Sequence, residues 1–199
     1  MAEEKDKIKS ILEKYKIVAV VGLSKDPSKD SYRVAKYLKD AGYRVIPINP
    51  FAEEILAEKC YKSLLEMPKE VQKLVEIVDI FRPSQELLQI VDQAIILRED
   101  YGVISVIWTQ LGIENEESAK RAKKAGLTVI TNKCMMIEHS KLIDRNVESL
   151  VSALNKMKDK KLRDEMGNKF HEEIMKNWTW TKRIEDFRKM FKMFFEMKK

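Results

Sequence analysis

A glycine turn near the start of the chain carries the residues best suited to bind a phosphate. Gly22, Leu23 and Ser24 follow an apolar run at residues 17–21 and precede a helical pattern that begins at Ser31. Backbone amides in such a turn face a bound diphosphate, and the Ser24 hydroxyl adds a donor. The turn therefore predicts a nucleotide-type ligand, although many strand-to-helix turns carry glycine for steric reasons alone.

The end of the second apolar run discriminates between nucleotide classes. An NAD site requires an Asp or Glu there to accept hydrogen bonds from the ribose hydroxyls. In this chain Asn49 and Pro50 stand at that place, which disfavours NAD. Lys25, Lys29 and Arg33 lie nearby, and cations suit a ligand with an additional phosphate, such as a 3′-phosphorylated ADP or NADP. The alternative is that these charges are only solvated.

Repeated strand and helix patterns would position this turn. Short β-branched runs predict strands at residues 17–21, 44–48, 75–80, 103–108 and 127–131. Helical spacing predicts helices at residues 3–15, 31–41, 84–97 and 115–125, and Gly42, Gly102 and Gly126 supply three of the helix ends. The pattern predicts a Rossmann-like α/β fold, a doubly wound parallel five-stranded sheet in the order 3-2-1-4-5.

The predicted strands stop before residue 135, and the rest of the chain has helical patterns only. We therefore expect a Rossmann-like domain over residues 1–145 and an all-helical C-terminal extension over residues 146–199. Over residues 151–199, Lys and Arg number 14 and Asp and Glu number 8, which accounts for the net charge of +6. Any electrostatic partner must therefore be sought for the extension.

The last helical pattern has one apolar face, formed by Ile184, Phe187, Phe191, Phe194 and Phe195. Such a face requires burial, which predicts packing on the sheet domain, a homo-oligomer or a protein partner. A basic opposite face leaves a membrane surface as the less favoured alternative. We expect no nucleic-acid partner, because the basic residues alternate with acidic ones and no recognition module is present.

Composition limits the remaining classes. The charged N-terminus has no apolar segment of a secretory signal, and no run is long enough to span a bilayer, so we expect a cytoplasmic protein. Cys60 and Cys134 lie far apart, without a CxxC or a histidine cluster. This spacing argues against a disulfide framework and against a metal site.

Seven short motifs follow one another along the chain, at residues 21–24, 31–34, 42–50, 60–61, 79–82, 108–113 and 132–139. As a set, over roughly residues 15–142, they resemble the small CoA-binding domain proteins. These proteins are similar to the CoA-binding domain of succinyl-CoA synthetase α subunits. The resemblance implies the same Rossmann-like fold and coenzyme A, free or acylated, as the ligand.

The resemblance also implies a set of ligand-binding residues. Gly22, Leu23, Ser24 and Lys25 would hold the diphosphate, Ser31 and Arg33 would contact phosphate, and Asn49 and Pro50 would border the adenosine. Residues after the third, fourth and fifth predicted strands would line the rest of the ligand path: Phe81, Arg82, Pro83, Trp108, Thr109, Gln110, Gly112, Cys134 and Met135. For Phe81 and Trp108 the alternative is packing in the core.

No catalytic arrangement is evident. The succinyl-CoA synthetase relatives work through a phosphorylated histidine from a further domain, and here His139 is better explained as a structural residue. We therefore expect binding without turnover. The alternatives are an NADP-dependent reductase, a subunit of an acyl-CoA ligase that acts with a partner, or an interaction protein with a vestigial pocket. A mixed disulfide between Cys134 and the CoA thiol would require that Lys133 lower the cysteine pKa.

The extension resembles a different family. Residues 147–194 are similar to the C-terminal helices of group 1 glycosyltransferases of the GT-B type, through Leu162, Arg163, Met166, Gly167 and residues 178–180. The sugar-nucleotide domain that precedes these helices in that family has no counterpart in this sequence, so we expect no glycosyl transfer.

Overall fold

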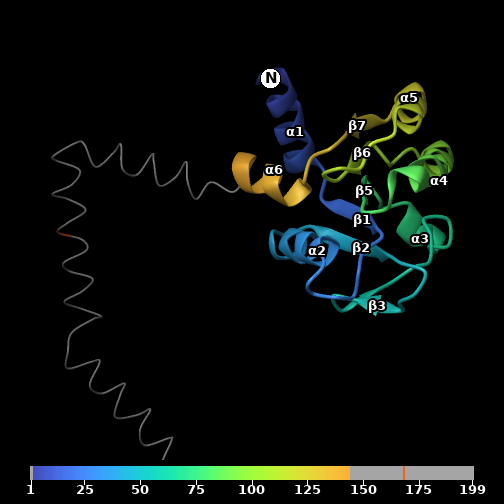
Figure 1. Ribbon diagram of the computed structural model, residues 1–199, viewed down its shortest axis with the longest axis horizontal. Coiled ribbons are helices and arrows are strands. Elements are labelled where there is room, and N and C mark those ends of the chain that lie inside the picture. Colours follow the sequence, from blue (N-terminus) through green and yellow to red (C-terminus); the bar gives the residue numbers. More distant parts are fainter. Residues whose placement is uncertain (1, 144–167, 169–199) are drawn as a thin grey trace, which may run out of the picture. The chain divides into compact units, whose positions relative to one another are not determined.

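The computed structural model describes residues 2–143 and residue 168 (Figure 1). Its elements follow one another along the chain as α1 (Ala2–Lys14), β1 (Ile17–Val21), α2 (Asp30–Asp40), β2 (Arg44–Ile48), β3 (Glu54–Ile55), β4 (Glu58–Lys59), α3 (Lys69–Gln72), β5 (Ile77–Ile80), η1 (Ser84–Glu86), α4 (Leu87–Tyr101), β6 (Val106–Thr109), α5 (Glu116–Lys124), β7 (Thr128–Ile130) and α6 (Met135–Leu142).

Five strands form one parallel sheet in the order β2-β1-β5-β6-β7. The predicted Rossmann-like α/β class and the five strand positions are confirmed, but the predicted strand order is wrong. When the five strands of this sheet are numbered by their order along the chain, they lie side by side in the order 2-1-3-4-5, with the third strand beside the first. Pro47 in β2 lacks a backbone N–H, and such a residue suits the edge of a sheet better than the central place that the predicted order required.

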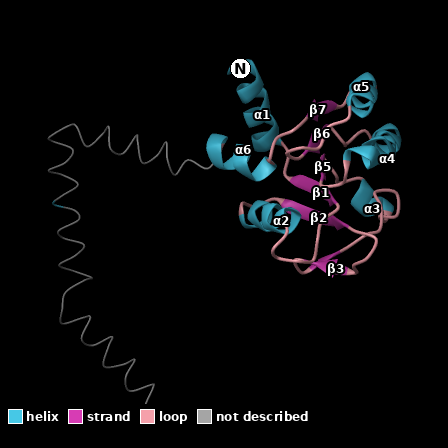
Figure 2. Ribbon diagram, in the orientation of Figure 1, coloured by secondary structure: helices cyan, strands magenta, loops and turns pink. Residues whose placement is uncertain are grey.

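Helices cover both faces of the sheet (Figure 2). On one face α1, α2 and α6 bury a cluster that includes Leu12, Leu38 and Trp108. On the other face α3, α4 and α5 cover a second cluster that includes Ile80 and Leu97. Because α2 and α3 lie on opposite faces, right-handed crossovers carry the chain from β1 outward to β2 and then back past β1 to β5.

Most element boundaries agree with the sequence patterns. The expected helix at residues 84–97 begins as the 3-10 turn η1 and continues as α4 to Tyr101. Gly42, Gly102 and Gly126 have positive φ angles after α2, α4 and α5, as the helix-end prediction requires. The sequence patterns did not reveal the β3–β4 hairpin or the short α3.

The segment after the hairpin is attached to the edge strand. Tyr61 forms an isolated parallel bridge with Ile48, its amide donates to the Pro47 carbonyl at 3.0 Å, and its carbonyl accepts from Asn49 at 2.8 Å. These bonds hold residues 60–63 beside the carboxyl end of β2.

Apart from residue 168, the predicted extension lies outside the described residues, and so do its expected contacts with partners. The division at residue 145, the homo-oligomer and the cytoplasmic location therefore stay predictions. Within residues 2–143, no helix is both long and apolar enough to cross a bilayer. The same part of the chain contains no cluster of His, Cys, Asp or Glu arranged to hold a metal ion.

One buried carboxyl group stands out in the sheet. Asp79 of β5 is fully buried between Val20 and Trp108 of the neighbouring strands. Its Oδ1 accepts a hydrogen bond from the Gln110 side-chain Nε2 at 2.7 Å, whereas Oδ2 has no partner among the described residues. Burial raises the pKa of Asp79 to about 7. The folded state therefore favours the protonated carboxyl group.

We expect Asp79→Asn to flatten the dependence of stability on pH. Between pH 4 and 7 the carboxyl group stays protonated in the folded state but ionises in the unfolded state. The native protein therefore loses stability as the pH rises through this range, and this loss stops above pH 7. Each pKa unit of difference corresponds to about 1.4 kcal/mol. Urea unfolding, followed by circular dichroism at pH 4.5 and 8, measures the free energy of unfolding of both proteins. Relative to the native protein, the variant should be more stable at pH 8 than at pH 4.5. Parallel pH profiles for the two proteins would contradict this.

Candidate functional site

The site predicted from the glycine turn lies where the strand order reverses. β1 is followed along the chain by its neighbour on one side, β2, and later by its neighbour on the other side, β5. Ligands of open α/β sheets bind beyond the carboxyl ends of the strands at such a point. The loops after β1 and β5 therefore form the expected binding edge.

These two loops meet at Gly22. Its φ angle is +86°, and a Cβ atom at this position would lie 2.7 Å from Arg82 Cδ and 3.0 Å from the Phe81 carbonyl oxygen. A side chain larger than hydrogen therefore displaces the Arg82 side chain and crowds the Phe81 carbonyl. Glycine is thus required here for close approach as well as for conformation.

Backbone hydrogen bonds fix the approach. The Gly22 amide donates to the Ile48 carbonyl at 2.9 Å, and the Phe81 amide donates to the Val21 carbonyl at 2.8 Å. The ends of β1, β2 and β5 are therefore held together in one plane of the sheet.

The turn itself is also fixed from within. The Ser24 amide donates to the buried Ser31 hydroxyl at 3.0 Å, and the Ser24 hydroxyl accepts from the Asp26 amide at 3.0 Å. Two of the four amides expected to hold a diphosphate, those of Gly22 and Ser24, are thus engaged inside the protein. The amides of Leu23 and Lys25 donate to no other described residue.

Asn49 connects the turn to the end of β2. Its side-chain amide donates to the Leu23 carbonyl at 2.8 Å, and its Oδ1 accepts from the Phe51 amide at 2.8 Å. An aspartate could not make the first of these bonds, because a carboxylate has no donor. The neutral residue that disfavours NAD is therefore also the residue that holds the turn.

A cavity of about 390 Å³, here called cavity A, opens on one side of the meeting point. Four of the sequence-predicted residues line it together with Gly22: Ser24, Asn49, Pro50 and Arg82. The adjacent Phe51 also lines it and is 86% exposed, which is unusual for a large aromatic side chain. Such a ring offers a stacking surface for a base.

A second cavity of about 380 Å³, cavity B, lies at the ends of α2 and α6. The predicted residues Arg33, Phe81, Gln110 and Cys134 line it. Its remaining lining is mostly apolar: Val34, Leu111, Ile113, Met136 and Ile137, with Asp30 beside Arg33. Phe81 and Arg82 are consecutive, so the loop after β5 separates cavity B from cavity A.

The arginines of both cavities are paired with carboxylates. Arg82 donates two hydrogen bonds to Glu86, at 2.8 and 2.7 Å, and the arginine holds the pKa of Glu86 below its usual range. Arg33 lies 2.8 Å from Asp30 on the first turn of α2. Each ion pair is partly or largely exposed, so a phosphate group competes with the carboxylate for the guanidinium.

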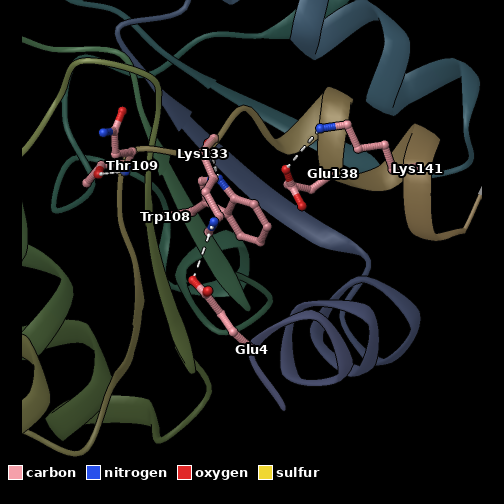
Figure 3. Close-up of polar contacts among 7 residues, drawn as sticks. Glu4, Trp108, Thr109, Lys133, Glu138 and Lys141 are labelled. Atoms are coloured by element: carbon pink, nitrogen blue, oxygen red, sulfur yellow. Dashed lines mark hydrogen bonds and ion pairs between the residues drawn. The ribbon is translucent and has the colours of Figure 1, made fainter. Parts of the chain in front are cut away.

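Several predicted residues present no side chain to either cavity. Leu23, Trp108 and Met135 are fully buried in the core cluster of the α1, α2 and α6 face. The Trp108 indole donates to the Lys133 carbonyl at 2.6 Å (Figure 3). Packing, the alternative considered for Trp108, accounts for its position, whereas Phe81 both packs against the core and lines cavity B.

The other predicted residues have structural contacts or lie outside the two linings. The Thr109 hydroxyl donates to the Ile113 carbonyl at 2.6 Å, and the Gly112 amide donates to Asn132 Oδ1 at 2.9 Å. These bonds shape the loop after β6. Lys25 and Pro83 line neither cavity A nor cavity B.

The environment of Cys134 does not favour a thiolate. Burial raises the pKa of its thiol, and the carboxylates of Asp79 and Asp30 raise it further. The Lys133 ammonium group lies 3.4 Å from Glu4 of α1 (Figure 3). The condition set for a mixed disulfide, a cysteine pKa lowered by Lys133, is therefore not met.

His139 has the surroundings of a structural residue. It is buried on α6, its Nδ1 lies 3.0 Å from the Tyr37 hydroxyl, and its ring makes edge contacts with Tyr37 and Tyr43. It lines neither of the two cavities at the carboxyl edge of the sheet.

Sequence reasoning missed a group of residues in cavity A: Phe51, Lys62, Ser63, Glu86, Gln89 and Gln93. The position of Phe51 directly after the Asn-Pro pair was a usable signal for it. The others come from the segment after β4 and from the start of α4, and no periodic pattern indicates that these segments face the same cavity.

Comparisons with known proteins show the family of this domain. Residues 16–140 match the CoA binding domain family. The uncharacterized protein YneT of Bacillus subtilis is 39% identical over 136 residues, which are 68% of this chain and 94% of that protein. The alpha subunit of ADP-forming acetate–CoA ligase II of Pyrococcus furiosus is 31% identical over 125 residues, which are 60% of this chain and 27% of the subunit.

A solved structure has the same fold. A hypothetical protein from Pyrococcus horikoshii superposes with a TM-score of 0.63 and 40% sequence identity, covering 70% of this chain and 92% of that one. The comparisons give no support to the resemblance of the extension to glycosyltransferases, since the family match ends at residue 140. Residues 16–140 make up more than half of the sequence, and on that match the chain belongs to the CoA-binding domain family.

Proposed function

We propose that this protein binds coenzyme A, free or acylated, across the carboxyl edge of its sheet and does not turn it over. The observation that carries the proposal is the turn at Gly22, which lies at the reversal of strand order and lines cavity A, while cavity B is lined by Phe81 of the loop that Gly22 contacts. Family membership supports the choice of ligand.

The two cavities suit the two halves of the coenzyme. The adenosine fits cavity A, where Asn49 and Pro50 were expected to border it and where the exposed Phe51 ring offers a stacking surface. The diphosphate follows the turn, with the amides of Leu23 and Lys25 as donors. The pantetheine arm, which is long and largely apolar, fits the mostly apolar cavity B.

The polar contacts support coenzyme A over a nicotinamide dinucleotide. NAD binding would need an acidic group at the end of β2, where this chain has Asn49. The Asn49 side chain donates to the Leu23 carbonyl and accepts from the Phe51 backbone amide. An acid at this position would disrupt the turn that binds the diphosphate. This argument does not apply to the NADP-dependent reductase, because the 2′-phosphate of NADP is bound by a cation instead of an acid.

The side chains of both cavities support binding without turnover. Their carboxylates, Glu86 and Asp30, are each paired with an arginine. The one thiol, Cys134, has a raised pKa. Neither lining contains a histidine, the side chain used most often as a general base.

A second candidate is a subunit of an acyl-CoA ligase that acts with a partner. The match to the Pyrococcus furiosus ligase subunit favours it, and the chain spans only 27% of that subunit. In this case a partner would supply the catalytic groups. Purified protein alone would bind CoA equally well in both cases, so turnover that appears only with a second protein would separate them.

Titration calorimetry with CoA, acetyl-CoA, NAD and NADP tests the ligand class. CoA and acetyl-CoA should bind, whereas NAD should bind at least roughly tenfold more weakly because the acidic ribose contact is missing. NADP should also bind more weakly than CoA, because the mostly apolar cavity B suits the pantetheine arm better than a nicotinamide nucleotide. If NADP bound as tightly as CoA, the assignment of cavity B to the pantetheine arm would fail.

Gly22→Ala tests the position of the site, and Gly102→Ala is its matched control. Both residues have positive φ, at +86° and +71°, so either alanine costs roughly 1–2 kcal/mol of folding stability. A Cβ at Gly102 has nothing within 4 Å, whereas one at Gly22 meets Phe81 and Arg82. CoA titration should show a loss of binding of tenfold or more in Gly22→Ala alone. Equal CoA affinity in the two folded variants would place the site elsewhere.

A further inference from the structure

The 3′-phosphate of coenzyme A needs a cation close to the adenosine. That phosphate is attached to the adenosine ribose, so the group that binds it must line the cavity that holds the adenosine. This inference rests on the proposed function, which assigns the adenosine to cavity A. Arg33, which the sequence suggested for an additional phosphate, lines cavity B and pairs with Asp30. Arg33 therefore does not line the cavity that is assigned to the adenosine and its 3′-phosphate.

Two cations line cavity A, Arg82 and Lys62. Arg82 is held by two hydrogen bonds to Glu86, and its side chain lies against Gly22, at the place of the diphosphate. Lys62 is exposed and forms no ion pair within the described residues. It is the cation of this cavity that a phosphate monoester meets without first displacing a carboxylate.

The backbone around Lys62 is positioned by the edge strand. The preceding residue, Tyr61, exchanges hydrogen bonds with Pro47 and Asn49, at 3.0 and 2.8 Å. On the other side, the Leu64 amide donates to Gln93 Oε1 at 3.2 Å. These bonds hold the segment beside Asn49, which borders the proposed adenosine site. The backbone of Lys62 is therefore fixed, and its side chain lines the cavity from that position.

We infer that Lys62 forms the 3′-phosphate subsite and that the site thereby distinguishes CoA from dephospho-CoA. The ammonium group supplies up to three donors to the phosphate oxygens. Phe51, which also lines cavity A, contacts the adenine, which both ligands share. The two side chains therefore have separable effects: Lys62 acts on the phosphate alone, and Phe51 acts on every adenine ligand.

Calorimetric titrations of the full chain with CoA and with dephospho-CoA test the inference. Lys62→Gln should lower the affinity for CoA about tenfold, because it removes the charged donor to the 3′-phosphate. It should change the affinity for dephospho-CoA by less than about twofold. Lys59→Gln is the matched control: Lys59 also stands near Tyr61, with its ammonium 5.7 Å from the ring centroid, but does not line cavity A. This control should change neither affinity, although it removes the same charge.

Phe51→Ala provides the complementary pattern. It should weaken CoA and dephospho-CoA by the same factor, about five- to a hundredfold, since base stacking is lost in both complexes. Circular dichroism establishes that each variant is folded. Lys62→Arg should restore most of the preference for CoA, because the charge and donors return.

The outcomes separate the inference from the function beneath it. If the native protein binds neither ligand, the proposed function fails and the subsite with it. If the native protein binds both but Lys62→Gln retains the full preference for CoA, the subsite assignment alone is overturned. An equal loss in Lys59→Gln and Lys62→Gln would also overturn it, since the effect would then come from net charge.

Discussion

The close approach of two loops at Gly22 is the constraint on which this site depends. The strand order places β1 and β5 side by side, and hydrogen bonds from Gly22 to Ile48 and from Phe81 to Val21 bring three strand ends together. The absence of a Cβ lets Arg82 and the Phe81 carbonyl contact the turn directly. This contact lies between the two cavities, and on the proposed function it is where the coenzyme passes from one cavity to the other.

Most of the polar side chains at this edge hold the protein itself. Asn49 binds the turn to the end of β2, Ser31 accepts from Ser24, and Gln110 donates to the buried Asp79. Ligand recognition is thus left to a few groups at the cavity walls and to the remaining backbone amides. A scaffold of this kind suits binding, because its donors are fixed before the ligand arrives and little conformational entropy is lost on association.

The sequence predicted the fold class and the five strands because apolar β-branched runs and glycine helix ends are local signals. Strand order is not local: both orders allow short right-handed connections, and only Pro47 in β2 indicated an edge. The glycine turn, Asn49 and Arg82 were found by their place after strands. Phe51 and Lys62 were missed because the segment after β2 has no periodic pattern, and its attachment through Tyr61 depends on tertiary hydrogen bonds. Trp108 shows the opposite error, since its place at a strand end suggested a ligand contact, whereas its side chain is fully buried.

A crystal structure of the protein grown with a saturating concentration of coenzyme A tests the central claim most directly. The account predicts density for the diphosphate within hydrogen-bond distance of the Leu23 and Lys25 amides, with the adenine in cavity A beside Phe51 and the pantetheine arm in cavity B. Coenzyme bound away from this edge, or a turn that stays unoccupied beside the Arg82–Glu86 ion pair, would contradict it.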